Sequence, residues 1–205
     1  MPTLRPRRTQ QQRREETIGR LLDAAGEALF EVGYSHTTVQ EICSRAGLSQ
    51  GALFRHFPTR RAVLAATAAR VAEEQVQSFR NRFEGVVASP ETMLPALREL
   101  RDLTRSHNNQ VWHELVHAAR TDEKLQHEIQ PALRDYRRRS AQALIEFAGA
   151  MFPSEEELRA VFRVCFHYFD GEASASAVLS DPEREERSLQ ILADLVLARA
   201  GVPAR

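Results

Sequence analysis

The sequence has 205 residues, of which 42% are hydrophobic, so the chain can bury a substantial core. Its 28 basic and 28 acidic residues give a formal net charge of +0, which excludes a generic polyanion binder and requires any nucleic-acid affinity to come from local charge. No apolar run approaches the about eighteen residues that a membrane span requires, and the N-terminus lacks the apolar stretch of a signal peptide. We therefore expect a cytoplasmic protein without membrane contact, in which Cys43 and Cys165 are buried thiols rather than a disulfide.

Local positive charge is concentrated at the N-terminus. The arginines that precede the first acidic residue are Arg5, Arg7, Arg8, Arg13 and Arg14. Residues 1–12 are rich in Pro, Gln and Arg and have almost no apolar content, which predicts a disordered basic arm. Such an arm is either a solvated tail or a segment that follows DNA phosphates and the adjacent minor groove.

A stripe of apolar residues at helical spacing follows the arm. Its members are Ile18, Leu21, Leu22, Ala25 and Leu29. The stripe predicts a helix over about residues 13–32, which Gly33 closes and which packs behind the next segment.

Residues 37–59 have the pattern of two short helices joined by a glycine turn. Thr37 is expected to cap the first helix, with Gln40 completing a capping box. Gly47 lies where the chain must reverse, because glycine adopts positive φ without steric cost. Ser49 is then the expected N-cap of the second helix. The residues expected to face inward are Val39, Ile42, Cys43 and Ala46 in the first helix and Leu53, Phe54 and Phe57 in the second.

This spacing is that of a helix-turn-helix, whose second helix enters the major groove of DNA. The residues on or near its outer face are Gln50, Gly51, Ala52, Arg55 and His56. Arg can bond guanine O6 and N7, and Gln can bond adenine N6 and N7. The alternative interpretation is an ordinary helical hairpin in which Arg55 and His56 are plain surface residues.

The segment GYSHTTVQEICSRAGLSQGALFRHFPTRRAVL resembles the N-terminal DNA-binding domain of the tetracycline-repressor (TetR) family, over about residues 17–66. Phe54 stands where tyrosine is common in the family, and Arg60 stands where lysine is usual. The resemblance implies a DNA-binding domain over residues 13–66 and a helical effector-binding and dimerisation domain over residues 67–205. The DNA-binding residues implied are Thr37, Thr38, Gln40, Ser49, Gln50, Gly51, Ala52, Phe54, Arg55, His56 and Arg60.

The rest of the chain shows helical periodicity without alternating strand patterns, which predicts an all-α protein. Thr59 is expected to cap a long helix to about residue 85, and Pro90 or Thr92 to open the next helix, to about residue 107. Later helices are expected over about residues 111–120, 121–147 and 154–179 and from residue 182 onward. Pro131 lies inside the segment 121–147 and predicts either a kink or two helices.

The last two helices carry small and apolar residues suited to a two-fold four-helix interface. The residues expected there are Phe169, Ala173, Ala177, Leu189, Leu192, Leu195 and Val196. Intramolecular packing is the alternative, and the family resemblance favours a homodimer.

His113, Glu114 and His117 match the H-E-x-x-H pattern, in which two histidines on one helix face bind zinc and the glutamate is a general base. A helical metal-dependent hydrolase is therefore the alternative function. The extended form of the motif is absent, because Arg120 and Glu123 stand where it requires glycine and histidine. We expect the two histidines to line a pocket or lie half-buried in the core, and a non-catalytic metal site stays open.

Aromatic residues concentrate in the C-terminal two thirds of the chain and can form the apolar walls of a small-molecule site. The residues expected to line it are Phe83, Trp112, His113, His117, Tyr136, Phe147, Phe162, Phe166 and His167. The expected function is that of a non-enzymatic transcriptional regulator without a cofactor. The resemblance implies a homodimeric repressor that a small, mostly apolar effector releases from a palindromic double-stranded DNA operator.

Overall fold

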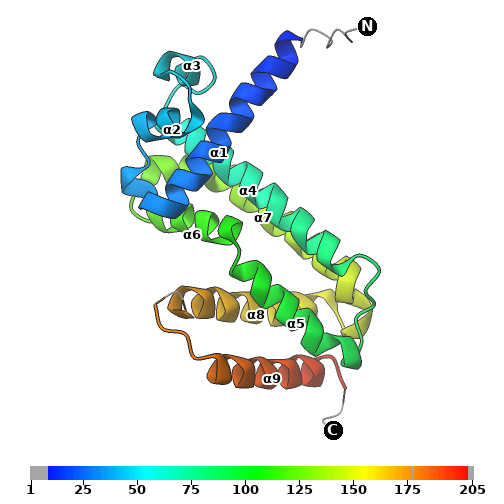
Figure 1. The fold of residues 1–205 in the computed structure, drawn as a ribbon. Coiled ribbons are helices and arrows are strands. Elements are labelled where there is room, and N and C mark those ends of the chain that lie inside the picture. The colour runs from blue at the N-terminus through cyan, green and yellow to red at the C-terminus, as the bar shows by residue number, and fades with distance from the viewer. Residues whose placement is uncertain (1–8, 177, 203–205) are drawn as a thin grey trace, which may run out of the picture. The chain divides into compact units, whose positions relative to one another are not determined.

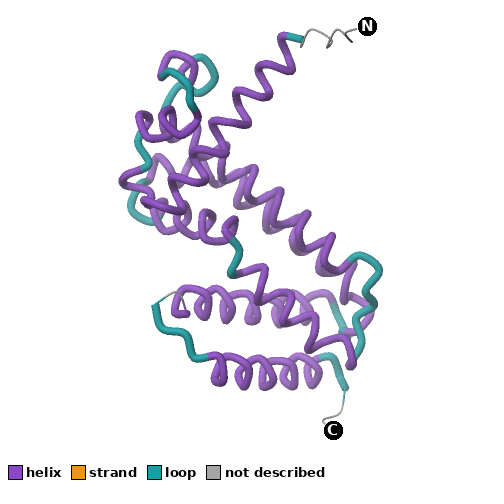
Figure 2. Tube along the Cα trace, in the orientation of Figure 1, coloured by secondary structure: helices purple, strands orange, loops and turns teal. Residues whose placement is uncertain are grey.

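The computed structural model describes residues 9–176 and 178–202, and within those ranges every regular element is a helix (Figure 2). The all-α prediction is confirmed. The elements, labelled in Figure 1, are α1 Gln10–His36, α2 Val39–Ala46, α3 Gln50–Phe54, α4 Arg60–Phe83, α5 Pro90–Thr104, α6 His107–Ala119, α7 Glu123–Ala148, the 3-10 turn η1 Gly149–Met151, α8 Glu155–Ser176 and α9 Pro182–Arg199.

The chain divides into two compact units. The N-terminal unit comprises Met1–Arg70 and Val111–Ala132, and the C-terminal unit comprises Val71–Gln110 and Leu133–Arg205. Helices α4, α6 and α7 contribute residues to both units. The expected domains differ from these units, because residues 111–132 group with the N-terminal segment through contacts distant in sequence.

In the N-terminal unit, α1 begins earlier than expected. Thr9 is its N-cap: the Thr9 hydroxyl accepts the Gln12 N–H at 3.2 Å, and Gln12 Oε1 accepts the Thr9 N–H at 2.9 Å. This reciprocal pair satisfies two backbone donors at the helix start. Residues 10–12 are therefore helical, which corrects the prediction of a disordered arm reaching residue 12. The remainder of the predicted arm, residues 1–8, lies outside the described residues.

The apolar stripe of α1 is buried as predicted, and α1 packs against α2. The buried members of the stripe are Leu21, Leu22, Ala25 and Leu29. The chain leaves regular helical geometry at Gly33, whose φ is 73°. This left-handed conformation favours glycine at that position.

The predicted cap of α2 is corrected by one residue. Thr38, not Thr37, accepts the N–H of residue N3, which is Glu41, at 3.1 Å. Thr37 is fully buried, and its hydroxyl donates to the Gly33 carbonyl at 2.7 Å. Gln40 consequently has no place in a capping box.

In the C-terminal unit, α5, α8 and α9 pack against one another (Figure 1). The core that they share with α4 and α7 includes Phe79, Leu97, Leu144, Phe169 and Leu189. Pro90 is the first residue of α5, where its missing N–H has no helical partner to lose, and Ser89 caps that helix. The assigned helix α7 continues through Pro131 as a single element.

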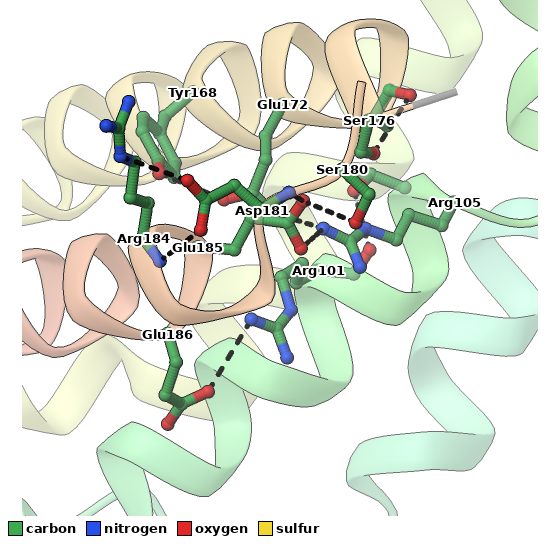
Figure 3. A network of polar contacts seen from close by, with 12 residues as sticks. Arg101, Arg105, Tyr168, Glu172, Ser176, Ser180, Asp181, Arg184, Glu185 and Glu186 are labelled. Carbon is green, nitrogen blue, oxygen red and sulfur yellow. Dashed lines mark hydrogen bonds and ion pairs between the residues drawn. The ribbon is translucent and has the colours of Figure 1, made fainter. Parts of the chain in front are cut away.

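A polar network joins the end of α8 and the start of α9 to α5 (Figure 3). Arg105 Nη2 donates to Glu172 Oε1 and to Glu185 Oε2, each at 2.8 Å. The Tyr168 hydroxyl donates to Glu172 Oε2 at 2.9 Å. The hydrogen bond from Arg105 holds the pKa of Glu185 below its usual value. Both carboxylates are largely shielded from water. Removing Arg105 would leave their two negative charges without a counter-charge in that environment, which is destabilising.

Cys43 and Cys165 are both buried free thiols, as predicted. Burial raises the pKa of Cys165 to about 12, so the thiol stays protonated and unreactive. Among residues 9–176 and 178–202, no helix combines the length and apolar content needed to cross a membrane.

Candidate functional site

The turn between α2 and α3 has the geometry expected from the sequence. Gly47 adopts φ 60° and ψ 38°, and the Leu48 N–H bonds to the Cys43 carbonyl at 3.0 Å. Ser49 caps α3 by accepting the Ala52 N–H at 3.2 Å. This closed turn fixes the direction in which α3 leaves α2.

Helix α3 buries a single residue, Leu53, and exposes most of the others. Gln50, Gly51 and Arg55 are exposed, and His56 is half-buried. A Cβ added at Gly51 would meet only Ser49 Oγ, at 3.8 Å, so folding does not require glycine there. Phe54 is 48% exposed, which corrects the expectation that it faces inward. This helix therefore presents a polar and partly apolar outer face.

A groove lies between the first turns of α1 and the two residues that follow α3. The lining residues are Gln10, Gln11, Arg13, Arg14, Glu15, Thr17, Ile18, Arg55 and His56. Arg13, Arg14 and Arg55 outnumber the single acid, Glu15, so the groove is locally basic although the chain is neutral overall. Anions are attracted to such a surface. The sequence singled out Arg13 and Arg14 as local positive charge but did not indicate that they share a groove with Arg55 and His56, because that pairing depends on contacts distant in sequence.

Two expected DNA contacts are engaged within the chain instead. Thr37 is buried, so it cannot reach a ligand. Arg60 Nε donates to the Thr37 carbonyl at 2.6 Å, and Arg60 Nη2 donates to the Tyr34 carbonyl. The Arg60 guanidinium also lies 4.2 Å from the centroid of the Tyr34 ring. Arg60 therefore closes the end of α1 in this structure, whereas the sequence analysis expected it at a phosphate.

Tyr34 is also held by two acidic residues of the same unit. Glu114 Oε1 accepts the Tyr34 backbone N–H at 2.6 Å, and Asp122 Oδ2 accepts the Tyr34 hydroxyl at 2.7 Å. Arg61 Nε donates to Asp122 at 3.0 Å. Hydrogen bonds from Tyr34 and from the Leu125 N–H lower the pKa of Asp122 to about 2. No sequence pattern announced this cluster, because its members are far apart along the chain.

The same contact argues against the metal-dependent hydrolase. Glu114, the supposed general base, is occupied by the Tyr34 N–H. The His113 and His117 rings are 5.8 Å apart between centroids, yet no group of three or more potential ligands exists in the described part of the chain. The H-E-x-x-H alternative is thus not supported.

The C-terminal unit contains a cavity of about 410 Å³ lined by α4, the α5–α6 turn, α7 and α8. Of the predicted pocket residues, Tyr136, Phe162 and Phe166 line it. Phe83 and Phe147 instead line a small apolar void of about 30 Å³ beside it.

The other predicted pocket residues are corrected. Trp112, His113 and His117 belong to the N-terminal unit and do not line the cavity, and His167 is exposed on α8. The polar residues that do line it include Gln75, Asn108 and Asn109, which the sequence analysis missed. Amide side chains occur both on cavity walls and on solvated surfaces. Because these three follow no helical periodicity, the sequence does not identify them as cavity residues.

One hydrogen bond between residues of the cavity lining joins α7 to α4. The Tyr136 hydroxyl donates to Gln75 Oε1 at 3.2 Å. Burial raises the pKa of Tyr136 to about 12, so the phenol remains protonated and can make this bond at any physiological pH.

The expected dimer surface is also revised. Phe169, Leu189, Leu192 and Val196 are buried within one chain, so their side chains have no surface left for a second subunit. Leu195 is 58% exposed, and its neighbour one turn earlier, Ile191, is 54% exposed. Ala173 is half-buried, and Ala177 lies outside the described residues.

A capped bihelical turn, an exposed second helix and an adjoining basic groove define the class of helix-turn-helix DNA-binding proteins. Comparison with known proteins narrows the class. The profile described as "Bacterial regulatory proteins, tetR family" matches residues 21–67. An uncharacterized HTH-type transcriptional regulator of Mycobacterium tuberculosis is 41% identical over 191 residues, or 93% of this chain and 98% of the relative. The chain belongs to the TetR family of DNA-binding transcriptional regulators.

More distant relatives extend over most of the chain. CymR of Pseudomonas putida, an HTH-type transcriptional regulator, is 27% identical over 88% of this chain and 89% of its own length. Solved TetR-family structures share the fold. A regulator from Mesorhizobium loti superposes with a TM-score of 0.71 at 14% identity, covering 91% of this chain and 97% of that chain. A regulator from Rhodococcus sp. RHA1 gives 0.69 at 23% identity, with 91% and 99% coverage.

Proposed function

We propose that this regulator is a homodimeric repressor that binds a palindromic operator through α3 and is released by a small, mostly apolar effector. The observation that carries the proposal is the exposed outer face of α3 beside the basic groove of α1. DNA binding itself follows from the family to which the chain belongs.

Base reading is assigned to the exposed side chains of α3. Arg55 can form two hydrogen bonds to guanine, and Gln50 can do the same with adenine. Phe54 offers an apolar surface for a thymine methyl group. Gly51 allows the helix backbone to approach the duplex closely. Thr38, Gln40, Ser49, Ala52 and His56 remain proposed as supporting contacts.

Phosphate binding is assigned to α1. Arg13 and Arg14 are exposed and line the same groove as Arg55. A phosphate contact fixes the position of the protein on DNA without reading sequence. The protein would thus use α1 for affinity and α3 for specificity.

Dimerisation is assigned to the exposed faces of α8 and α9. Ile191 and Leu195 are one helical turn apart on α9, and Val164 on α8 is 62% exposed. Burying such residues against a second copy is favourable by about 25 cal/mol per Å² of apolar surface. Two subunits would bring two α3 helices to half-sites about 34 Å apart, or a multiple of that spacing.

Effector binding is assigned to the cavity of the C-terminal unit. Its aromatic wall suits an apolar ligand, and the α4 residues Gln75 and Phe79 line it. The same helix begins at Arg60 in the N-terminal unit. A ligand that repositions α4 would alter operator affinity by about 5- to 150-fold, for a coupling free energy of about 1–3 kcal/mol.

A mobility-shift titration with the DNA upstream of the protein's own gene tests the proposal. Arg55→Ala should weaken specific binding by about 1–3 kcal/mol if Arg55 reads a guanine. Arg138→Ala is the matched control, because Arg138 is an exposed arginine on α7 outside the groove. Equal affinities of Arg55→Ala and wild type would refute the base-reading role.

A further inference from the structure

The amide side chains at the cavity have N–H groups that are engaged by neighbouring acceptors. Asn109 Nδ2 donates to the Thr104 carbonyl at 2.7 Å and to Asp170 Oδ1 at 3.1 Å. Asn108 Nδ2 donates to Glu74 Oε2 at 2.9 Å. Because carbonyls and carboxylates only accept, these contacts fix which amide atom is nitrogen. The amide oxygens of Asn108 and Asn109 are what these side chains can offer to a ligand.

Two hydroxyl groups of the wall also donate to neighbouring acceptors. The Tyr136 hydroxyl donates to Gln75 Oε1 at 3.2 Å, and Thr104 Oγ1 donates to the Arg101 carbonyl at 2.7 Å. Each of these hydroxyls has its one proton engaged, and the Tyr136 oxygen also has a partner in Ser140. The amide oxygens of Asn108 and Asn109 are therefore the groups on which the ligand assignment rests, and a ligand bound to them must supply donors.

The charges around the cavity disfavour an ionic ligand. Glu74 and Asp170 accept hydrogen bonds from the amides of Asn108 and Asn109, so a carboxylate bound at those amides would lie near two like charges. Of the described residues that line the cavity, Arg82 carries a cation, and it is exposed and paired with Glu99. A bound ammonium would meet amide oxygens but no lining carboxylate, because Glu74 and Asp170 lie outside the lining and are engaged by the Asn108 and Asn109 amides, so its desolvation would be poorly compensated.

Another part of the lining is aromatic. Phe162 and Phe166 are in edge contact, with centroids 4.6 Å apart and planes at 73°. Phe79 meets Phe162 at 6.0 Å and 87°. All three rings line the cavity, and aromatic side chains of this kind pack favourably against another planar ring. A cavity of about 410 Å³ is within the range of small-molecule sites.

We propose that this cavity binds an uncharged aromatic molecule that carries hydrogen-bond donors, with a phenol as the simplest member of the class. The proposal rests on the proposed function, which makes the cavity the effector site. It goes further by stating that the ligand is neutral and donates hydrogen bonds to Asn108 and Asn109 while its ring packs against Phe162 and Phe166.

Calorimetric titration of the full-length protein with three matched probes provides the test. The probes are biphenyl-4-ol, biphenyl-4-carboxylate and biphenyl-4-methylammonium, which share one aromatic skeleton. The phenol should bind at least about tenfold more tightly than either ion, because only the phenol supplies a donor without a charge to desolvate. The proposal is wrong if an ionic probe binds as tightly as the phenol, or if none of the three binds.

Two variants locate the site. Asn108→Leu removes one acceptor and should weaken phenol binding about five- to tenfold. Gln142→Leu is the matched control, because Gln142 is an exposed amide on α7 outside the cavity lining that donates to Glu146 Oε1 at 3.2 Å. Equal losses in both variants would contradict the placement of the phenol. Far-ultraviolet circular dichroism of both variants checks that they fold. The comparison of the three probes on the wild-type protein does not depend on either variant.

Probe binding and operator binding, measured on one protein preparation, distinguish a failure of this inference from a failure of the proposed function. Operator binding in a mobility shift without phenol binding would overturn the ligand class alone. Phenol binding without any DNA complex would leave the ligand class standing and overturn the regulator's proposed use of the cavity.

Discussion

Two acidic side chains accept hydrogen bonds from two different groups of Tyr34. Its backbone N–H donates to Glu114 and its hydroxyl donates to Asp122. The Tyr34 N–H follows Gly33, where the regular geometry of α1 is interrupted, so Glu114 satisfies a donor that the helix no longer serves. A residue that looked catalytic in the sequence thus has a structural task.

Asp122 should make stability depend on pH. The lowered pKa means that the folded state favours the carboxylate, so the contribution of Asp122 is full above its usual pKa near 3.8 and is lost as pH falls through about 2. Asp122→Asn should lower the free energy of unfolding at pH 7 by about 1–2 kcal/mol, allowing for solvent screening. The difference from wild type should narrow below about pH 4.

Urea unfolding of both proteins between pH 7 and pH 3 measures this difference. Asp135→Asn is the control, because Asp135 forms only surface pairs on α7. A gap between wild type and Asp122→Asn that is constant across the range would contradict the assigned role.

At the scale of elements, the start of α2 distinguishes two caps. Thr38→Ala should destabilise the protein by about 1 kcal/mol because it removes the acceptor for the Glu41 N–H. Gln40→Ala should change stability by no more than about 0.5 kcal/mol, because an exposed side chain without a cap contact contributes little. Thermal or urea unfolding measures both. A larger loss for Gln40→Ala than for Thr38→Ala would restore the capping box expected from the sequence.

The first turns of α1 should contribute to affinity but not to specificity. Arg13→Ala and Arg14→Ala should each reduce the slope of log K against log salt by about 1, with similar losses for operator and random DNA. Fluorescence anisotropy over a salt series reports the slope, with Arg138→Ala as the control. A loss confined to the operator would assign these arginines to base contact instead.

The elements themselves were largely predictable because their signals are local. Gly47 and Ser49 identify the turn and the next helix from adjacent residues, and Pro90 and Pro182 mark helix starts in the same way. The start of α1 was missed because its cap, Thr9, stands in a polar segment that lacks apolar periodicity.

The sites depended on contacts that sequence spacing does not encode. Tyr34 and Glu114 are 80 residues apart, and Asn109 and Asp170 are 61 apart. Apolar periodicity also cannot tell which of two apolar helix faces is buried in the chain itself. Leu189 and Leu195 both fit the pattern of α9, yet only Leu189 is in the core.

At the scale of the whole molecule, the proposed dimer interface on the exposed face of α9 can be tested directly. Leu195→Arg should shift the protein from dimer to monomer, because it places a charge in the proposed apolar interface. Operator affinity should fall with it, since one α3 reads too few base pairs. Sedimentation velocity measures the state.

Val87→Arg is the matched control for this change. Val87 is 78% exposed and lies in the loop between α4 and α5, so it belongs to neither α8 nor α9. If Leu195→Arg sediments as wild type does, the interface must lie elsewhere on the chain.

Helix α3 buries one residue, Leu53, and this has a consequence for evolution. Only Leu53 is required for packing, so mutations at the exposed positions around it carry little folding penalty. Descendants of this gene could therefore acquire new target sequences by drift at a few neighbouring codons while the scaffold stays intact. Divergence among paralogues should accumulate on this outer surface before it reaches the helices that support it.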